Sequence, residues 1–179
     1  MIRPEIIIRS GKARQDLRDL KAHARQLRPL MKAIGEVLVD STKQRFRDGR
    51  SPDGSPWAGN SPVTILQYME RFSTSFSKRT GRITKAGTNR ATSKQPLIGE
   101  SKSLSRTINY RVVGNTVLVG SPMEYAATQQ FGARRGQFGN TRTGRPIPWG
   151  NIPARPYLGL SDHDRQTVVN LAREHLGSQ

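Results

Sequence analysis

The sequence feature that most constrains the fold is a long apolar stripe near the N-terminus. Hydrophobic residues recur there at alternating intervals of three and four positions: Leu17, Leu20, Ala24, Leu27, Met31, Ile34 and Leu38. This spacing aligns their side chains on one face of an α-helix, which turns about every 3.6 residues. Pro29 lies within the stripe, and a proline inside a helix removes a hydrogen bond and clashes with the preceding turn. We therefore predict a long amphipathic helix, ending near Arg47, that is kinked or broken near Pro29.

The apolar face of this helix can pack on a sheet of the same chain or form the seam of a coiled coil. The first alternative is favoured, because the stripe falls short of the roughly three or four heptads that identify a coiled coil. A β-hairpin that could form this sheet is predicted later in the chain. Apolar residues alternate with polar ones around the two-residue turn Gly114-Asn115: Ile108, Tyr110 and Val112 before it, and Val117 and Val119 after it.

A second long helix is predicted at the C-terminus. Ser161 can cap it, and Asp164 lies in the first turn, where an acidic side chain complements the helix dipole. Its buried side is expected to comprise Val168, Leu171, Ala172 and Leu176. The predicted fold class is α+β, with both helices packed on a small antiparallel sheet that contains the hairpin, plus extended basic loops.

The chain length of 179 residues fits a single domain, 1–179, with peripheral segments. An N-terminal arm, 1–12, carries three consecutive isoleucines that suit an edge strand or an addition to a neighbour's sheet. The stretch 73–95 lacks an apolar period and is predicted to be a basic loop or hairpin, and the Gly- and Arg-rich stretch 132–151 is predicted to be a second basic loop. Trp57 is expected to anchor the turn-rich segment 48–57 on the core.

The chain carries a net charge of +17, and its distribution is uneven. Between Arg71 and Ser161 there are fifteen Lys and Arg residues but only two acidic ones. Such an excess indicates an anionic partner, which could be nucleic acid, an acidic protein surface or a membrane surface, although a solvated loop is an equal alternative. The residues expected to face DNA or an acidic partner are Lys78, Arg79, Arg82, Lys85, Arg90 and Lys94.

Catalytic and metal-binding patterns are not evident in the sequence. The chain has no cysteine, and its three histidines are scattered without ligand spacing. Asp162-His163-Asp164 could hold a divalent ion, but helix capping explains this cluster better. We therefore expect no catalytic residue, no metal and no cofactor. No apolar run approaches the roughly 18–20 residues that span a bilayer, and the N-terminus lacks a signal-peptide core, so no membrane partner is expected.

Three segments, in order, resemble the Mu-like phage virion morphogenesis or tail-completion proteins. The first is Ser51-Pro52-Asp53-Gly54-Ser55-Pro56-Trp57 after Phe46. The second comprises Ser103 to Val112, the hairpin and Tyr125-Ala126-Ala127-Thr128-Gln129-Gln130-Phe131-Gly132. The third is Ile152-Pro153-Ala154-Arg155-Pro156-Tyr157-Leu158-Gly159-Leu160-Ser161. Two positions depart from the family pattern: Gln129 replaces a frequent histidine, and Glu100-Ser101-Lys102 replaces a Thr-Gly pair.

This resemblance implies a structural, non-enzymatic protein of the phage neck, present in the virion and assembled in the host bacterial cytoplasm. It implies a homo-oligomeric ring of six or twelve copies that caps the tail and contacts connector or adaptor proteins and the tail tube or terminator, with genomic double-stranded DNA passing through the lumen. The alternative function is a small basic module that binds nucleic acid non-specifically.

Aromatic and arginine side chains are typical of protein contacts, and they guide the choice of interface residues. The residues expected at subunit or partner interfaces are Ile6, Ile7, Ile8, Tyr125, Phe131, Arg134, Arg135, Trp149, Arg155 and Tyr157. Tyr125 and Phe131 have a core position as their alternative. Arg155 could pair with an acidic residue of an adjacent subunit, and an intramolecular partner is equally compatible with the sequence.

Overall fold

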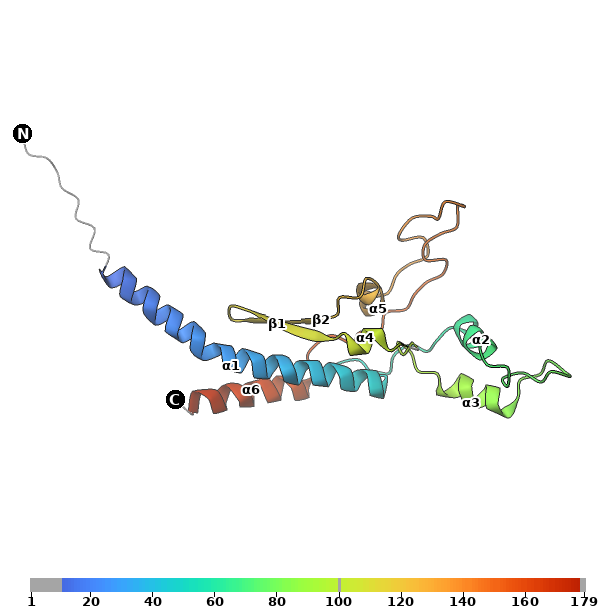
Figure 1. The fold of residues 1–179 in the computed structure, drawn as a ribbon, viewed down its shortest axis with the longest axis horizontal. Coiled ribbons are helices and arrows are strands. Elements are labelled where there is room, and N and C mark those ends of the chain that lie inside the picture. The colour runs from blue at the N-terminus through green and yellow to red at the C-terminus, as the bar shows by residue number, and fades with distance from the viewer. Residues whose placement is uncertain (1–10, 100, 178–179) are drawn as a thin grey trace, which may run out of the picture.

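The computed structural model describes residues 11–99 and 101–177. Over these residues the chain forms six helices and one two-stranded antiparallel sheet, an α+β arrangement as predicted (Figure 1). The isoleucines of the N-terminal arm, Ile6, Ile7 and Ile8, lie outside the described residues.

Helix α1 (Gly11–Asp48) is continuous through Pro29, so the predicted break is wrong. Figure 1 shows instead that the helix axis bends, and the N-terminal part points away from the rest of the molecule. A proline can remain inside a helix when the axis bends away from the clash that its ring would make. In the second half of α1, Leu30, Ile34 and Val39 are buried, because this half packs on the hairpin and on the C-terminal helix.

The predicted hairpin is formed by β1 (Asn109–Val113) and β2 (Thr116–Gly120), which pair in register from Val113 opposite Thr116. Gly114 supplies the positive φ that a two-residue hairpin turn requires. The hairpin packs on α1, and the ring of Tyr110 lies so close to Gly35 that a Cβ there would be 2.2 Å from Cδ2 of the ring. A glycine in the middle of α1 therefore allows the hairpin to approach the helix.

The core forms where the end of α1 meets two distant loops. Phe46 is buried against Trp57, with their ring centroids 5.4 Å apart, and against Tyr157, at 5.2 Å. The indole Nε1 of Trp57 donates a hydrogen bond of 2.7 Å to the carbonyl oxygen of Pro156. Trp57 thus anchors its loop on the core, as predicted, and Leu104 and Ile108 extend the same cluster.

Helix α6 (Asp162–Gly177) begins with a reciprocal capping arrangement. The backbone N–H of Asp164 donates to the hydroxyl oxygen of Ser161, and the backbone N–H of Ser161 donates to the Asp164 carboxylate. That carboxylate is buried and forms an ion pair with the guanidinium of Arg45 on α1. The capping interpretation of the Asp162–Asp164 cluster is therefore confirmed, and the ion pair fixes α6 against α1.

Two short helices, α2 (Pro62–Glu70) and α3 (Lys85–Ser93), pack on each other and project from the end of the molecule (Figure 1). The prediction of a loop or hairpin over 73–95 requires correction, because residues 85–93 are helical. The preceding segment does turn back on itself, with an isolated bridge between Phe76 and Ile83. Helix α3 has no apolar period, and its first turn is capped by the hydroxyl of Thr84, which accepts from the Gly87 N–H. We call residues 62–95 the α2–α3 projection.

The other basic segment, 132–151, is a loop as predicted. It leaves from α5 (Ala126–Phe131) and closes through isolated bridges, from Ala133 to Ile152 and from Asn140 to Pro146. Helix α4 (Ser103–Arg106) lies between the α2–α3 projection and the hairpin. No helix in the described part of the chain is long and apolar enough to cross a bilayer.

Candidate functional site

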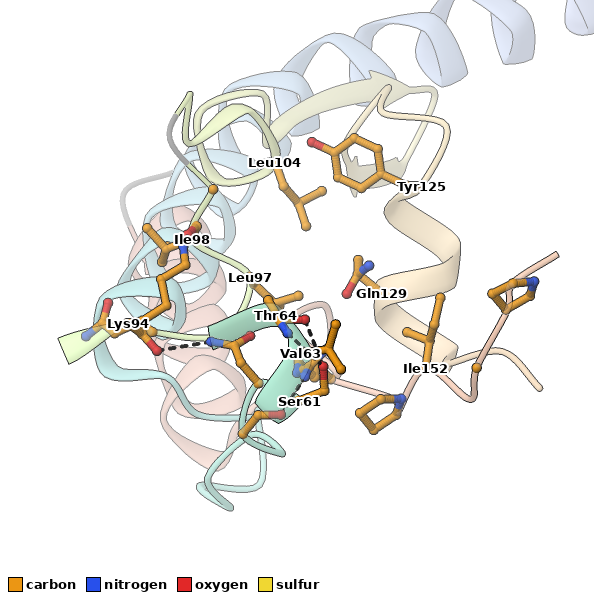
Figure 2. Close-up of a pocket in the computed structure, with 18 of the residues that line it drawn as sticks. Ser61, Val63, Thr64, Lys94, Leu97, Ile98, Leu104, Tyr125, Gln129 and Ile152 are labelled. Carbon is orange, nitrogen blue, oxygen red and sulfur yellow. Dashed lines mark hydrogen bonds between the residues drawn. The ribbon is translucent and has the colours of Figure 1, made fainter. Parts of the chain in front are cut away.

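A groove of about 850 Å³ lies where the base of the α2–α3 projection faces α5 and the end of the 132–151 loop. Its walls come from four stretches that are far apart in the sequence: the start of α2, the connection from α3 to α4, α5, and residues 148–155. Apolar side chains form much of the lining: Val63, Leu97, Ile98, Leu104, Tyr125 and Ile152. Figure 2 shows these side chains around a shared opening. We call this feature the interhelical groove.

Side chains of α5 and of Tyr125, which precedes it, point in different directions. Tyr125 and Gln129 lie one helical turn apart and both point into the opening (Figure 2), with Tyr125 46% exposed. Gln130 instead faces the protein interior. Its side-chain oxygen Oε1 accepts hydrogen bonds from the backbone N–H groups of Tyr157 and Leu158, and its side-chain Nε2 donates to the Leu158 carbonyl. One side of α5 therefore holds the fold, and the other side is open to a partner.

Arg155, predicted as an interface residue, is buried below the groove. Its Nε and Nη2 donate hydrogen bonds of 2.8 Å to the carbonyl oxygens of Ala58 and Gly59. Burial lowers the pKa of the guanidinium. Its partners are thus backbone carbonyl groups of the same chain. The arginine thereby connects residues 152–161 to the loop that precedes α2.

Tyr157, a second predicted interface residue, lies in the core with 1% of its surface exposed. Its hydroxyl donates to the carbonyl oxygen of Ala126, and burial raises the pKa of the phenol. The assignment of Tyr157 and Arg155 to a contact surface is therefore corrected: both side chains stabilise the fold from inside.

Large aromatic side chains remain exposed beside the groove. Phe131 is 77% exposed and Trp149 is 73% exposed. Trp149 lines the interhelical groove, whereas Phe131 lines a smaller adjoining hollow of about 380 Å³ that shares Ile152 with it. We call Tyr125, Phe131 and Trp149 the aromatic rim. Since Tyr125 and Phe131 are exposed, the alternative that they are core residues is wrong.

Arg134 and Arg135, the remaining predicted interface residues, are exposed beside the rim, and Arg134 lines the smaller hollow. The structure therefore brings Arg134, Arg135 and the aromatic rim to one region of the surface. Their role in contacts between subunits stays a prediction.

The six predicted basic residues fall into two groups. Lys78, Arg79, Arg82 and Lys85 are exposed around the turn at the tip of the α2–α3 projection. The other two are half-buried and serve the projection itself. The guanidinium carbon of Arg90 lies 4.6 Å from the centroid of the Phe72 ring, and Nζ of Lys94 lies 4.9 Å from that of Tyr68. We call the four exposed residues the basic tip.

Groups that could support catalysis do not converge within the described residues. No set of three or more His, Asp or Glu side chains there could hold a metal ion. The two acidic residues of the Asp162–Asp164 cluster lie in different environments: Asp164 is buried against Arg45, whereas Asp162 is fully exposed.

The groove itself was missed by sequence reasoning. Val63, Leu97 and Gln129 come from segments with no shared motif, and only the fold brings them together. The adjacent Gln129 and Gln130 are indistinguishable in the sequence, although one faces the groove and the other the core. The presence of Tyr125 and Trp149 was the one signal available for this region.

The comparisons with known proteins agree with this structural picture. The phage virion morphogenesis family matches residues 9–177, nearly the whole chain. No curated protein and no solved structure matches.

Proposed function

This chain belongs to the phage virion morphogenesis family and has a structural role in phage assembly, and we propose that it completes the tail as a ring subunit of the neck. Copies of the chain close into a ring of six or twelve at the head-proximal end of the tail. One face of the ring contacts the tail tube or terminator, and the other contacts the connector or adaptor proteins.

The observation that carries this proposal is the exposed aromatic rim beside an apolar groove. Phe131 and Trp149 leave about three quarters of their surface in solvent, which is unfavourable for a chain that acts alone. Buried aromatic anchors dominate the energy of protein interfaces, so a second protein that covers the rim would gain most from these two side chains. Contacts of this kind between identical subunits generate a closed ring when the rotation between neighbours closes.

The oligomeric state of the purified chain tests this proposal. We expect native mass spectrometry and negative-stain electron microscopy to show a ring, and the variant Trp149→Ala to shift the distribution toward monomers. Val169→Ala is a matched control, because Val169 is an exposed apolar residue of α6, away from the rim. A chain that stays monomeric at high concentration and binds no tail or connector component would contradict the proposal.

The basic tip supports a second candidate, a module that binds nucleic acid non-specifically. Its four cations are exposed, and no acidic residue occurs between Arg71 and Gly99 to neutralise them. Phosphate contacts by such residues make affinity fall steeply with salt. A monomer that binds duplex DNA tightly, and loses binding when all four residues are replaced by glutamine, would favour this candidate. Assembly that the same replacement leaves unchanged would favour the ring.

A further inference from the structure

The interhelical groove is better suited to an apolar segment than to a charged one. Lys94 and Arg155 are the only charged residues in its described lining. Both are already engaged: Nζ of Lys94 donates to the Ile98 carbonyl and lies over the Tyr68 ring, and Arg155 donates to two backbone carbonyls. A polyanion would find no free cation in the groove, whereas an apolar side chain would contact Val63 and Leu97.

The groove also offers a polar group for the backbone of an extended chain. Among the described residues, the side-chain amide of Gln129 makes no hydrogen bond, and it points into the opening (Figure 2). An amide side chain presents both a donor and an acceptor, which is what one peptide unit of an extended segment needs. The fitting occupant is therefore an extended segment with apolar side chains.

The chain contains one segment of this chemistry outside the described residues. Ile6, Ile7 and Ile8 form its only run of three consecutive isoleucines, and β-branched residues favour an extended backbone. This run precedes the first described residue, Gly11, by only three to five positions.

The length of α1 decides whether the run can occupy the groove of its own chain. Helix α1 comprises 38 residues, so it is about 57 Å long. The groove lies at the far end of this helix, because Gln95, which lines it, donates to the Arg47 carbonyl. Ile7 is four residues from Gly11 and thus within about 14 Å of it. The isoleucine run cannot reach its own groove.

We propose that the isoleucine run of one copy binds in the interhelical groove of the next copy. This inference rests on the proposed ring and specifies its contact. The isoleucine run and the groove lie at opposite ends of α1. Every copy therefore inserts its isoleucine run into the groove of one neighbour and receives the run of the other neighbour in its own groove, so the contact is head-to-tail. The N-terminal half of α1, which points away from the rest of the molecule in Figure 1, spans the distance between neighbours.

Cross-linking between single-cysteine variants tests this contact directly, because the chain has no native cysteine. Ile7→Cys protein is mixed with Val63→Cys protein and treated with a short bifunctional maleimide. Since docking raises the effective concentration of the two thiols, we expect about tenfold more cross-linked heterodimer than in a matched mixture. The matched mixture replaces Val63→Cys with Val113→Cys, because Val63 and Val113 are similarly exposed, at 50% and 52%, and Val113 lies at the hairpin turn.

Charge substitutions provide the second measurement. Ile7→Asp and Val63→Asp are each expected to weaken assembly by about tenfold or more, since a buried carboxylate without a partner is unfavourable. An aspartate at position 63 is compatible with folding, because it lies in the first turn of α2, where acidic residues are favoured. Ile2→Asp, outside the run, is the control and should assemble normally.

The outcomes separate this inference from the function on which it rests. Oligomers that form, but cross-link no more through Val63→Cys than through Val113→Cys, would overturn the groove contact and leave the ring intact. A chain that forms no oligomer would overturn both. Cross-linked heterodimers, together with impaired assembly of both aspartate variants, would establish the contact.

Discussion

The centre of the molecule differs from the segments that project from it, the 132–151 loop with α5 and the α2–α3 projection. The first difference concerns the exposure of aromatic residues. In the centre, Phe46 and Tyr157 are each 1% exposed and contact each other. In the 132–151 loop and the adjoining α5, Trp149 and Phe131 are mostly exposed. The same class of side chain therefore stabilises one region of the monomer and remains available in the other.

The two regions also differ in what holds them. The centre combines apolar burial with the buried ion pair between Arg45 and Asp164. The α2–α3 projection has few buried side chains and relies on capping by Ser61 and Thr84 and on a cation–π contact of Arg90. A segment with few buried apolar contacts opens at low free-energy cost, so it can adapt to a partner. The difference predicts that the α2–α3 projection opens more readily than the centre.

The largest expected effect comes from truncating an aromatic residue of the centre. Phe46→Ala should lower the free energy of unfolding by about 4 kcal/mol, because it leaves a cavity against Trp57 and Tyr157. Denaturant unfolding followed by circular dichroism measures this change. The matched control, Phe131→Ala, removes the same atoms from a 77% exposed position and should change stability by less than about 0.5 kcal/mol. Equal effects at both positions would contradict the comparison between regions.

The next effect concerns the ion pair that joins α1 to α6. Asp164→Asn should destabilise the chain by about 3 kcal/mol at neutral pH, because it leaves Arg45 buried without its charged partner. Gln166→Asn, an exposed change on the same helix, is the control. A loss no larger than that of the control would show that the centre does not depend on this pair.

The same carboxylate predicts the pH dependence of stability. Burial raises the pKa of Asp164, but hydrogen bonds with Ser41 and Ser161 and the charge of Arg45 outweigh it, so the pKa is lowered overall. Its stabilising contribution is therefore complete above the unfolded value of about 3.9 and is lost as the pH falls through the lower folded value. The free energy of unfolding of the wild type should therefore decrease as the pH falls through this range. The decrease due to Asp164 should be absent from Asp164→Asn.

A smaller effect, on association instead of folding, is expected at the aromatic rim. Trp149→Ala should weaken self-association by about 2 kcal/mol, roughly thirtyfold, if the rim is buried between subunits. Stability of the monomer should change little, because this side chain is 73% exposed. Sedimentation over a range of concentrations measures the first quantity, and chemical unfolding measures the second. A Trp149→Ala variant that loses monomer stability but assembles normally would show that Trp149 stabilises the fold and not the contact between subunits.

The smallest effect is expected within the α2–α3 projection. Arg90→Gln should destabilise the projection locally by about 1 kcal/mol, because it removes the cation over Phe72 and a hydrogen bond to Ser75. Faster amide hydrogen exchange in α3, with unchanged exchange in the second half of α1, would report this local change. Arg82→Gln at the exposed basic tip should leave both rates unchanged.

Sequence periodicity predicted the centre well. The stripe that contains Ile34 and the alternation around Gly114 each correspond to an element that buries one face, and burial of a face is what creates a period. The capping pattern at Ser161 was also readable, because capping depends on residues three positions apart. Helix α3 was missed because it buries little and so shows no apolar period.

The contacts of the candidate site were less predictable. Arg155 has no acidic neighbour in sequence, yet its partners are backbone carbonyls, which every residue has and no sequence pattern marks. Tyr157 and Tyr125 are both tyrosines beside small or proline residues, and only the packing places one inside and the other at the groove. Long-range packing, not local spacing, decides such assignments.

The hydrogen bonds of Arg45 have a consequence for synthesis on the ribosome. Its guanidinium donates to the carbonyl oxygens of Tyr157 and Gly159 and pairs with Asp164, all more than one hundred residues later in the chain. None of these partners has been synthesised while the ribosome is at an earlier codon. The aromatic ring of Tyr157, which packs against Phe46, is also absent until then. A prematurely terminated copy therefore cannot complete its fold.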